Sequence, residues 1–305
     1  MHLLNRDPNL RSVYIHTPVM VKEVMEYLRC EPGKVYVDGT IGGGGHSLEI
    51  LKRTSPDGQV IGIDWDRESV DLASRRLSNF KDRIHIFQDN FKNLDRILKE
   101  LHIQAVDGIF LDLGLSSYQL KSGRGFSFMQ DEPLDMRMGE ARVTAYDLIN
   151  HISVEELETI LRQYGEERWA YRIAKCIVSA RRVKSITTTK ELADIARNAI
   201  PLKHRPRRIH PATKTFQAIR IAVNHELENV ETFIGKGIDL LKQKGRICII
   251  SYHSLEDRIV KRGFRVGKEE KRLRIITPKP ITPSPEELHL NPRARSAKLR
   301  VAEKL

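Results

Sequence analysis

A glycine loop between two short apolar runs is the feature that most constrains how this chain can fold. Residues 35–47 read VYVDGTIGGGGHS, so a β-branched run ends in Asp38 and a loop with five glycines follows it. After a helix-forming stretch, a second apolar run ends in Asp64, 26 residues beyond the first acid. Strand, glycine loop, helix, strand and acid indicate a nucleotide-cofactor site at the edge of an α/β sheet. The glycines let backbone approach a ligand, and the second acid can accept both hydroxyls of a ribose.

The spacing of the glycines decides between two kinds of cofactor. A dinucleotide site needs G-x-G-x-x-G, but the third position counted from Gly42 is Ser47, and the second counted from Gly39 is Ile41. The form D-G-T-x-G-G-G-G-H instead resembles the first motif of Rossmann-like methyltransferases, which bind S-adenosylmethionine. The alternative is a glycine turn without a ligand, which the conformational entropy of four adjacent glycines disfavours.

Composition is typical of a globular protein of the cytoplasm. No apolar run approaches the ~20 residues of a membrane span, and the first residues lack the apolar core of a signal peptide. The three cysteines are widely separated, which suits reduced thiols and gives no metal-ligand spacing. We therefore expect no membrane partner and no metal.

Positive charge is concentrated in the second part of the chain. Residues 1–120 hold 15 Lys and Arg against 17 Asp and Glu, whereas residues 121–305 hold 37 against 23. Between Arg172 and Arg220 there are 13 basic residues and two acids. Such a cluster favours a nucleic-acid partner, because neutralised phosphates release counterions. A well-solvated basic surface is the alternative.

Alternating strand and helix patterns predict an α/β fold, a parallel sheet with helices on both faces. The expected strands are residues 35–38, 60–64, 84–87, 106–112 and 246–251, with a last strand at 297–304. Between 112 and 246 the strand pattern stops. Residues 113–143 are expected to form loops over the cofactor, residues 153–199 to form helices, and residues 212–245 to return as helix packed on the sheet. We therefore predict a Rossmann-like, class I methyltransferase domain from residues 1–118 and 212–305, with an inserted loop and all-helical domain at 119–211 that contacts RNA.

The cofactor side chains follow the first three strands, because ligands of such sheets lie beyond the carboxyl ends of the strands. His46, after Gly44 and Gly45, is expected near the amino-acid end of the cofactor, Asp64 at the ribose, and Phe91 against the adenine. Each has a structural alternative. Asp64 can cap a helix, Phe91 can belong to the core, and His46 can be a packing residue.

The fourth and fifth strands carry the reaction side of the predicted site. FLDLGLSS ends the fourth strand at Asp112, where amino methyltransferases have an acid or amide that accepts hydrogen bonds from the target amine. Accepting those bonds aims the nitrogen lone pair at the methyl group; contacting the cofactor alone is the alternative for Asp112. The usual base-stacking aromatic is missing from this motif. Gln119 lies within reach of the cofactor, and Tyr252 or His253, after the fifth strand, can stack a flipped base.

Motifs along nearly the whole chain resemble the MraW family of bacterial 16S rRNA methyltransferases. The resembling segments are HTPVM, VDGTIGGGGHS, DLGLSSYQL, GRGFSF, PLDMRM, YGEERWAYRIA, HPATKTFQAIRIAVNHEL, SYHSLEDR and NPRARSAKLRVAE, in this order. The resemblance implies methylation of N4 of a cytosine in the decoding region of 16S rRNA, within the small ribosomal subunit, with S-adenosylmethionine as methyl donor. It also implies cofactor contacts at Gly44, Gly45, His46, Asp64, Phe91, Asp112 and Gln119.

Two other functions are compatible with the residues. A methyltransferase of proteins or small molecules would make the basic insertion incidental. An RNA-binding assembly factor would keep the cofactor pocket without using it. Reading Ser251 and His253 as a hydrolase pair is disfavoured, because no G-x-S-x-G motif accompanies them.

Overall fold

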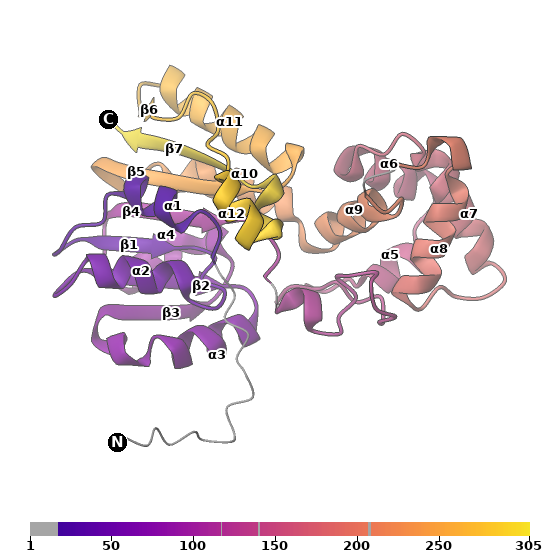
Figure 1. Ribbon diagram of the computed structural model, residues 1–305, viewed down its shortest axis with the longest axis horizontal. Helices are drawn as coiled ribbons and strands as arrows, with labels where there is room; N and C mark the ends of the chain where they lie inside the picture. Colours follow the sequence, from indigo (N-terminus) through magenta and orange to yellow (C-terminus); the bar gives the residue numbers. More distant parts are fainter. Residues whose placement is uncertain (1–17, 117, 140, 207–208) are drawn as a thin grey trace.

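The computed structural model describes residues 18–116, 118–139, 141–206 and 209–305. Two bodies lie side by side (Figure 1): a sheet covered by helices, and a smaller body built of helices α5 to α9. The chain leaves the sheet after its fourth strand, forms the helical body and returns before the fifth. This is the organisation that the interruption of the strand pattern predicts.

The sheet has seven strands in the order β3-β2-β1-β4-β5-β7-β6. Strands β1 to β5 are parallel, and β7 is antiparallel to both of its neighbours. Side chains of the central strands are buried almost without interruption, as expected when helices cover both faces of a sheet. The strands are β1 Val35–Asp38, β2 Gln59–Asp64, β3 Ile84–Gln88, β4 Val106–Asp112, β5 Leu241–Ser251, β6 Leu273–Ile275 and β7 Lys298–Lys304.

Two separate apolar layers hold helices on the faces of the sheet. One layer contains buried residues of α1 Val21–Leu28, α2 Gly45–Arg53 and α3 Arg67–Arg76, and Leu288 of the short α12 Pro285–Leu290 packs against it. The other layer contains buried residues of α4 Leu94–Glu100, α10 Glu226–Gly237 and α11 Ser254–Glu269. Short 3₁₀ turns lie at Ser78–Arg83, Phe91–Asn93, Gln119–Lys121, Leu202–His204 and Pro292–Ser296.

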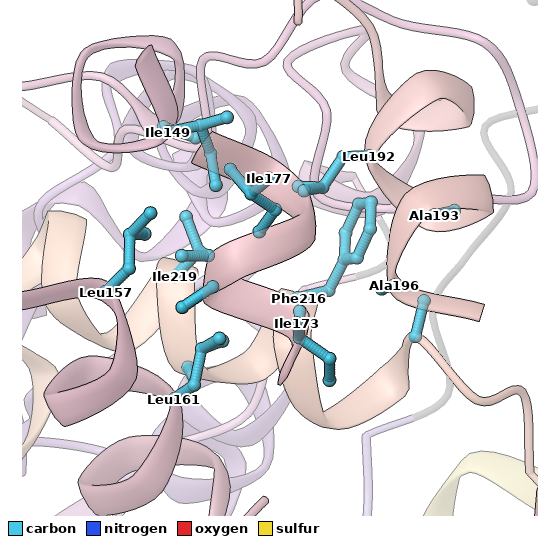
Figure 2. Packing of buried hydrophobic residues seen from close by; sticks show 14 of the residues in the cluster. Ile149, Leu157, Leu161, Ile173, Ile177, Leu192, Ala193, Ala196, Phe216 and Ile219 are labelled. Carbon is cyan, nitrogen blue, oxygen red and sulfur yellow. The ribbon is translucent and has the colours of Figure 1, made fainter. Parts of the chain in front are cut away.

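The helical body has a core of its own, formed by five helices (Figure 2). Leu157 and Leu161 face Ile219, while Ile173 and Ile177 fill the centre of the cluster. Its helices are α5 Ala145–His151, α6 Val154–Gly165, α7 Ala170–Arg181, α8 Thr189–Ala199 and α9 Thr213–Asn224. Capping boxes start three of them, at Thr144, Ser153 and Thr188. A self-contained core of this kind is the property of an inserted domain.

Helix α9 differs from the sequence expectation for residues 212–245. Its buried residues belong to the helical core, with Phe216 and Ile219 packed among α6, α7 and α8, and not to the sheet layers. The chain then turns at His225, which has a left-handed backbone with φ 50°, and α10 packs on the sheet as expected. The domain limits at 118 and 212 remain predictions, and this packing favours a second limit after α9.

Among the described residues, no helix is both long enough and apolar enough to cross a membrane.

Candidate functional site

The glycine loop crosses the carboxyl ends of three neighbouring strands. The Gly39 N–H donates to the Phe110 carbonyl of β4 at 2.9 Å, and the Ile41 N–H donates to the Ile63 carbonyl of β2 at 2.8 Å. Gly44 has φ 73°, which favours glycine, and α2 begins at the next residue. A Cβ on Gly45 would lie 2.3 Å from Cγ of Pro18, so this glycine is required by close packing of the chain entering the domain.

Asp64 ends β2 and ties it to the glycine loop. Its Oδ2 accepts the Gly42 N–H at 2.9 Å and its Oδ1 accepts the Asp66 N–H at 2.9 Å. Each oxygen keeps a lone pair for a further donor, so the group can still accept two hydroxyls. Burial raises the pKa of Asp64 to about 7, against the lowering effect of these two backbone bonds. The alternative role as a helix cap belongs to Asp66, whose side chain accepts the Glu68 N–H at the start of α3.

Asp38 is a member of the site that sequence reasoning did not assign. Its carboxylate is buried at the end of β1 and accepts a hydrogen bond from Ser47 Oγ at 2.7 Å. Burial raises the pKa of Asp38 to about 6. The pair fixes the first turn of α2 against β1. The sequence position of Asp38 could have marked it as a candidate, because an acid that ends an apolar strand next to a glycine loop is seldom a surface residue.

His46 points into the layer that covers the sheet. Its Nε2 lies 2.9 Å from the Val19 carbonyl oxygen, and its ring centroid lies 4.4 Å from that of Phe110. The ring thus packs α2 against β4 and against the chain before α1. These contacts match the structural alternative for the side chain. Its cofactor contact stays a prediction, for which the backbone N–H at the start of α2 is the suitable group.

Phe91 stands at the end of β3, in the 3₁₀ turn that Asn90 caps. Its ring meets Phe233 edge-on with centroids 5.5 Å apart, so one side belongs to the core. A Cβ on Gly39 would lie 3.3 Å from the Phe91 Cβ, which puts the residue beside the glycine loop. The structure therefore gives Phe91 both neighbours, the core and the loop, and its stacking on adenine stays a prediction.

Asp112 ends β4 next to the glycine loop. Its backbone N–H donates to Thr40 Oγ1 at 2.6 Å, and its Oδ1 accepts the Tyr252 hydroxyl at 2.8 Å. Burial raises the pKa of Asp112 to about 7, although the bond from Tyr252 acts to lower it. Burial and the nearby Asp112 raise the pKa of Tyr252, so the phenol stays protonated and donates. This is a carboxylate with a fixed orientation and a pKa near neutrality.

The loop after β4 folds back onto the end of β2. Gln119 is buried, and its Nε2 lies 3.5 Å from Asp66 Oδ2. Arg124 forms an ion pair with the same carboxylate. Further along, Gly139 lies so close to Trp65 that a Cβ would come within 2.2 Å of the indole. The segment at 113–143, which is expected to cover the cofactor, is therefore held at Asp66. Asp66 in turn donates its backbone N–H to Asp64.

The side chain of His253 is engaged at the start of α11, whereas that of Tyr252 contacts Asp112. It caps α11, and its Nε2 lies 3.0 Å from Glu256 Oε1. With Glu226, these side chains form a group whose possible metal-ligand atoms lie within 4.8 Å of one another. Both oxygens of Glu226 already accept bonds from half-buried Arg220, at 2.8 Å each. We interpret the group as an ion-pair cluster at the start of α11, and the expected absence of a metal stays a prediction.

The carboxyl ends of the parallel strands thus bring together most of the predicted residues. Asp64 and Asp112 flank the glycine loop directly, and Phe91 borders it. Gln119 joins through Asp66, and Tyr252 joins through Asp112. His46 and His253 have side chains directed into packing and capping contacts. Such a site offers a carboxylate for hydroxyls and a second carboxylate for a hydrogen-bond donor on a substrate.

Comparison with known proteins finds a family model and relatives that cover nearly the whole chain. The model of the MraW methylase family matches residues 13–305. A relative from Persephonella marina, named ribosomal RNA small subunit methyltransferase H, is 50% identical over 95% of this chain and 99% of its own length. Relatives of the same name from Syntrophotalea carbinolica and Clostridioides difficile are 47% and 46% identical, over 97% and 95% of this chain and 99% of each relative.

These matches confirm the predicted resemblance, the methyltransferase class of the fold and the cofactor type, S-adenosylmethionine. The motifs that carry the resemblance in the sequence are those that build the loop, Asp112 and the start of α11. By similarity over nearly its whole length, the chain belongs to the MraW methylase family.

Proposed function

We propose that this protein methylates N4 of a cytosine in the decoding region of 16S rRNA, by direct in-line transfer from S-adenosylmethionine. The observation that carries the proposal is Asp112, a carboxylate beside the glycine loop whose Oδ1 is fixed by Tyr252. The names of the relatives support small-subunit rRNA as substrate. The choice of cytosine N4 rests on the resemblance to the family and on the need of an exocyclic amine for a hydrogen-bond acceptor.

The chain's residues fit the cofactor. Asp64 has lone pairs left for ribose hydroxyls, and the glycines beside it leave backbone within reach of a ligand. When bound, S-adenosylmethionine supplies an electrophilic methyl group. We propose that Gly44, Gly45 and the His46 backbone hold its amino-acid end, while Phe91 and Gln119 border the rest.

The role of Asp112 follows from the chemistry of the amine. The lone pair of an exocyclic nitrogen is delocalised into the ring. When Asp112 accepts hydrogen bonds from the N–H groups of the amine, the lone pair becomes localised on the nitrogen. On methylation the amine nitrogen would gain positive charge, and the Asp112 carboxylate would stabilise it. The amine proton then passes to Asp112. A carboxyl pKa of about 7 suits a group that is ionised before transfer and accepts a proton after it.

The helical body supplies a surface suited to RNA. A pocket of about 210 Å³ has two aromatic rings, two cations and one acid in its lining, together with prolines and isoleucines: Trp169, His204, Arg168, Lys214 and Glu167. The Trp169 and His204 rings are 5.3 Å apart, and the Arg168 guanidinium lies 5.8 Å from the Trp169 ring. Aromatic rings with cations around them suit an unstacked base and its phosphate. Glu166 lies two residues before Arg168 and accepts hydrogen bonds from Ser254 and Arg258 of α11. The surface therefore continues to the turn that carries Tyr252.

Transfer of label distinguishes the three functions. The protein is incubated with radiolabelled S-adenosylmethionine and, separately, small ribosomal subunits, free rRNA and bulk protein. Label in rRNA, located at one cytosine by mass spectrometry, is the expected result. Label in protein would refute the proposal, and cofactor binding without transfer to any substrate would favour the assembly factor.

Residence of the protein in the cytoplasm stays a prediction.

RNA contact by the helical body has its own test. Reversing the charges of Arg168 and Lys203 should weaken RNA affinity and reduce its dependence on salt, while cofactor affinity stays the same. Lys99 and Lys268 are matched controls, because they lie in the last turns of α4 and α11, within the sheet body. Equal loss in both pairs would mean that total charge, and not this surface, governs binding. Arg207 and Arg208, which belong to the basic run between Arg172 and Arg220, lie outside the described residues.

A further inference from the structure

We propose that the Tyr252 hydroxyl, and not only its ring, takes part in the reaction as a positioning group for Asp112. The hydroxyl holds Oδ1 of Asp112 so that Oδ2 is presented to the target amine. This inference rests on the proposed function, because it takes Asp112 as the acceptor of the amine. It differs from the sequence prediction, in which the ring of Tyr252 or His253 stacks a flipped base.

Tyr252 is held at both ends. Its backbone N–H donates to Glu256 Oε2 at 2.8 Å, and its hydroxyl donates to Asp112 Oδ1 at 2.8 Å. Glu256 is itself buried and is fixed in the capping box of α11, where it also accepts the His253 N–H. The start of α11 therefore sets the position of the phenol, and the phenol sets the rotation of the carboxylate.

Gly114 leaves the space that the Tyr252 ring fills. A Cβ on Gly114 would lie 2.5 Å from Cε2 and 2.8 Å from Cδ2 of the ring, distances that real side chains do not reach. The glycine of D-L-G-L is thus required by a ring arriving from the turn after β5. The aromatic group that the strand-four motif lacks in sequence lies at the same strand end, contributed by another segment.

The charges around the pair make the hydroxyl important. Asp38 and Glu256 are acids near Asp112 that raise its pKa, and Glu256 and Glu287 act likewise on Tyr252. The Tyr252 hydroxyl is the side-chain donor that lowers the pKa of Asp112, with help from the Gly114 backbone. Without it, the carboxyl becomes more basic and loses the side-chain hydrogen bond that fixes Oδ1.

The test is Tyr252→Phe, which removes one oxygen atom and keeps the ring. We expect kcat to fall by about ten- to a hundredfold, as for loss of a hydrogen bond to a charged group, with KM for the cofactor unchanged. The acid limb of the pH–rate profile should move to higher pH, because the pKa of Asp112 rises. Tyr164→Phe is the matched control, since it removes a hydroxyl that contacts Glu228 outside the site.

Two further measurements keep the outcome decisive. Gly114→Ala should displace the ring and reduce kcat at least as much as Tyr252→Phe. In the Asp112→Asn background, Tyr252→Phe should add little, because the two groups act together. Normal kcat with an unchanged pH profile in Tyr252→Phe would overturn the inference and leave the ring as the functional part.

A measurement without substrate separates this inference from the proposed function. The carboxyl ¹³C resonance of Asp112, assigned by its loss in Asp112→Asn, is titrated in the wild type and in Tyr252→Phe. A higher pKa in the variant supports the pairing, and an unchanged pKa refutes it. If the wild type labels no rRNA, the proposed function fails, whereas this titration still decides whether Tyr252 controls the carboxylate.

Discussion

Carboxyl groups in the two bodies of the molecule are used in opposite ways. At the sheet edge, burial raises the pKa of Asp38, Asp64 and Asp112 to values of about 6 to 7. In the helical body, bonds from neighbouring donors lower the pKa of acids at helix starts, as for Glu191, which falls to about 2. Hydrogen bonds from the Ser or Thr of the capping boxes also lower the pKa of Asp147 and the pKa of Glu156.

The difference separates acids whose ionised form the fold favours from acids whose ionised form it disfavours. A lowered pKa means that the folded state favours the charged form, so the helix caps stabilise the protein at neutral pH. A raised pKa means the reverse, because folding then disfavours ionisation. Between the unfolded value near 4 and about 7, the folded state holds more protons, and the site acids make the protein less stable as pH rises. The site therefore carries an electrostatic cost that a ligand can relieve.

Replacing Asp112 by Asn should have the largest effect and separates chemistry from stability. We expect transfer to fall by roughly 10²- to 10³-fold, the usual effect of removing one charge-stabilising group. The melting temperature at pH 8 should not fall, because a buried carboxylate is replaced by a neutral group of the same shape. Activity and thermal melting are measured on the same preparation. Near-normal turnover would remove Asp112 from the mechanism.

Cofactor affinity should depend on pH through Asp64. Ribose hydroxyls donate to the ionised carboxylate, so binding should strengthen as pH rises and level off above the pKa of about 7. Below that pKa the dependence approaches about tenfold per pH unit. Calorimetric titration between pH 5.5 and 7.5 measures it, with Asp64→Asn as control. A pH dependence that persists in the control would assign the effect to another group.

The smallest effect is expected in the helical body, and only on stability. Thr144→Ala removes the Oγ1 that accepts the Asp147 N–H and should cost about 1 kcal/mol of unfolding free energy, with kcat unchanged. Thr159→Ala is the control, because this exposed threonine lies inside α6 and its hydroxyl donates back to the Glu155 carbonyl. If the first change reduced kcat and the second did not, the cap would have a role in transfer as well.

Local sequence patterns predicted where strands and helices lie along the chain better than which surfaces those elements pack against. The glycine loop, Asp64 and Asp112 follow apolar strands, and parallel strands bring their carboxyl ends together. The capping boxes at Ser153 and Thr188 were likewise readable as spacings. Helix α9 was placed on the wrong body, because an apolar face does not state which surface it covers. The three-residue β6 is too short to leave a pattern.

The side-chain geometry of the site depended on contacts between distant segments. Nothing local connects Tyr252 with Asp112, which lie 140 positions apart in the chain. Likewise, His46 contacts Val19 through a carbonyl that no side-chain pattern marks. The sequence motifs thus proposed the site residues, whereas the contacts of each side chain could be described only from the folded arrangement.

Strand β7 has a consequence for how the protein is made. It is the last strand of the sheet along the chain, yet it lies between β5 and β6 and bonds to both. During synthesis the β5 edge must therefore wait, unpaired, until residues 298–304 have emerged from the ribosome. The helical body, whose core ends at Val223, can fold well before that. The sheet body is thus the later of the two to mature, and until then its open strand edge exposes the translating chain to aggregation.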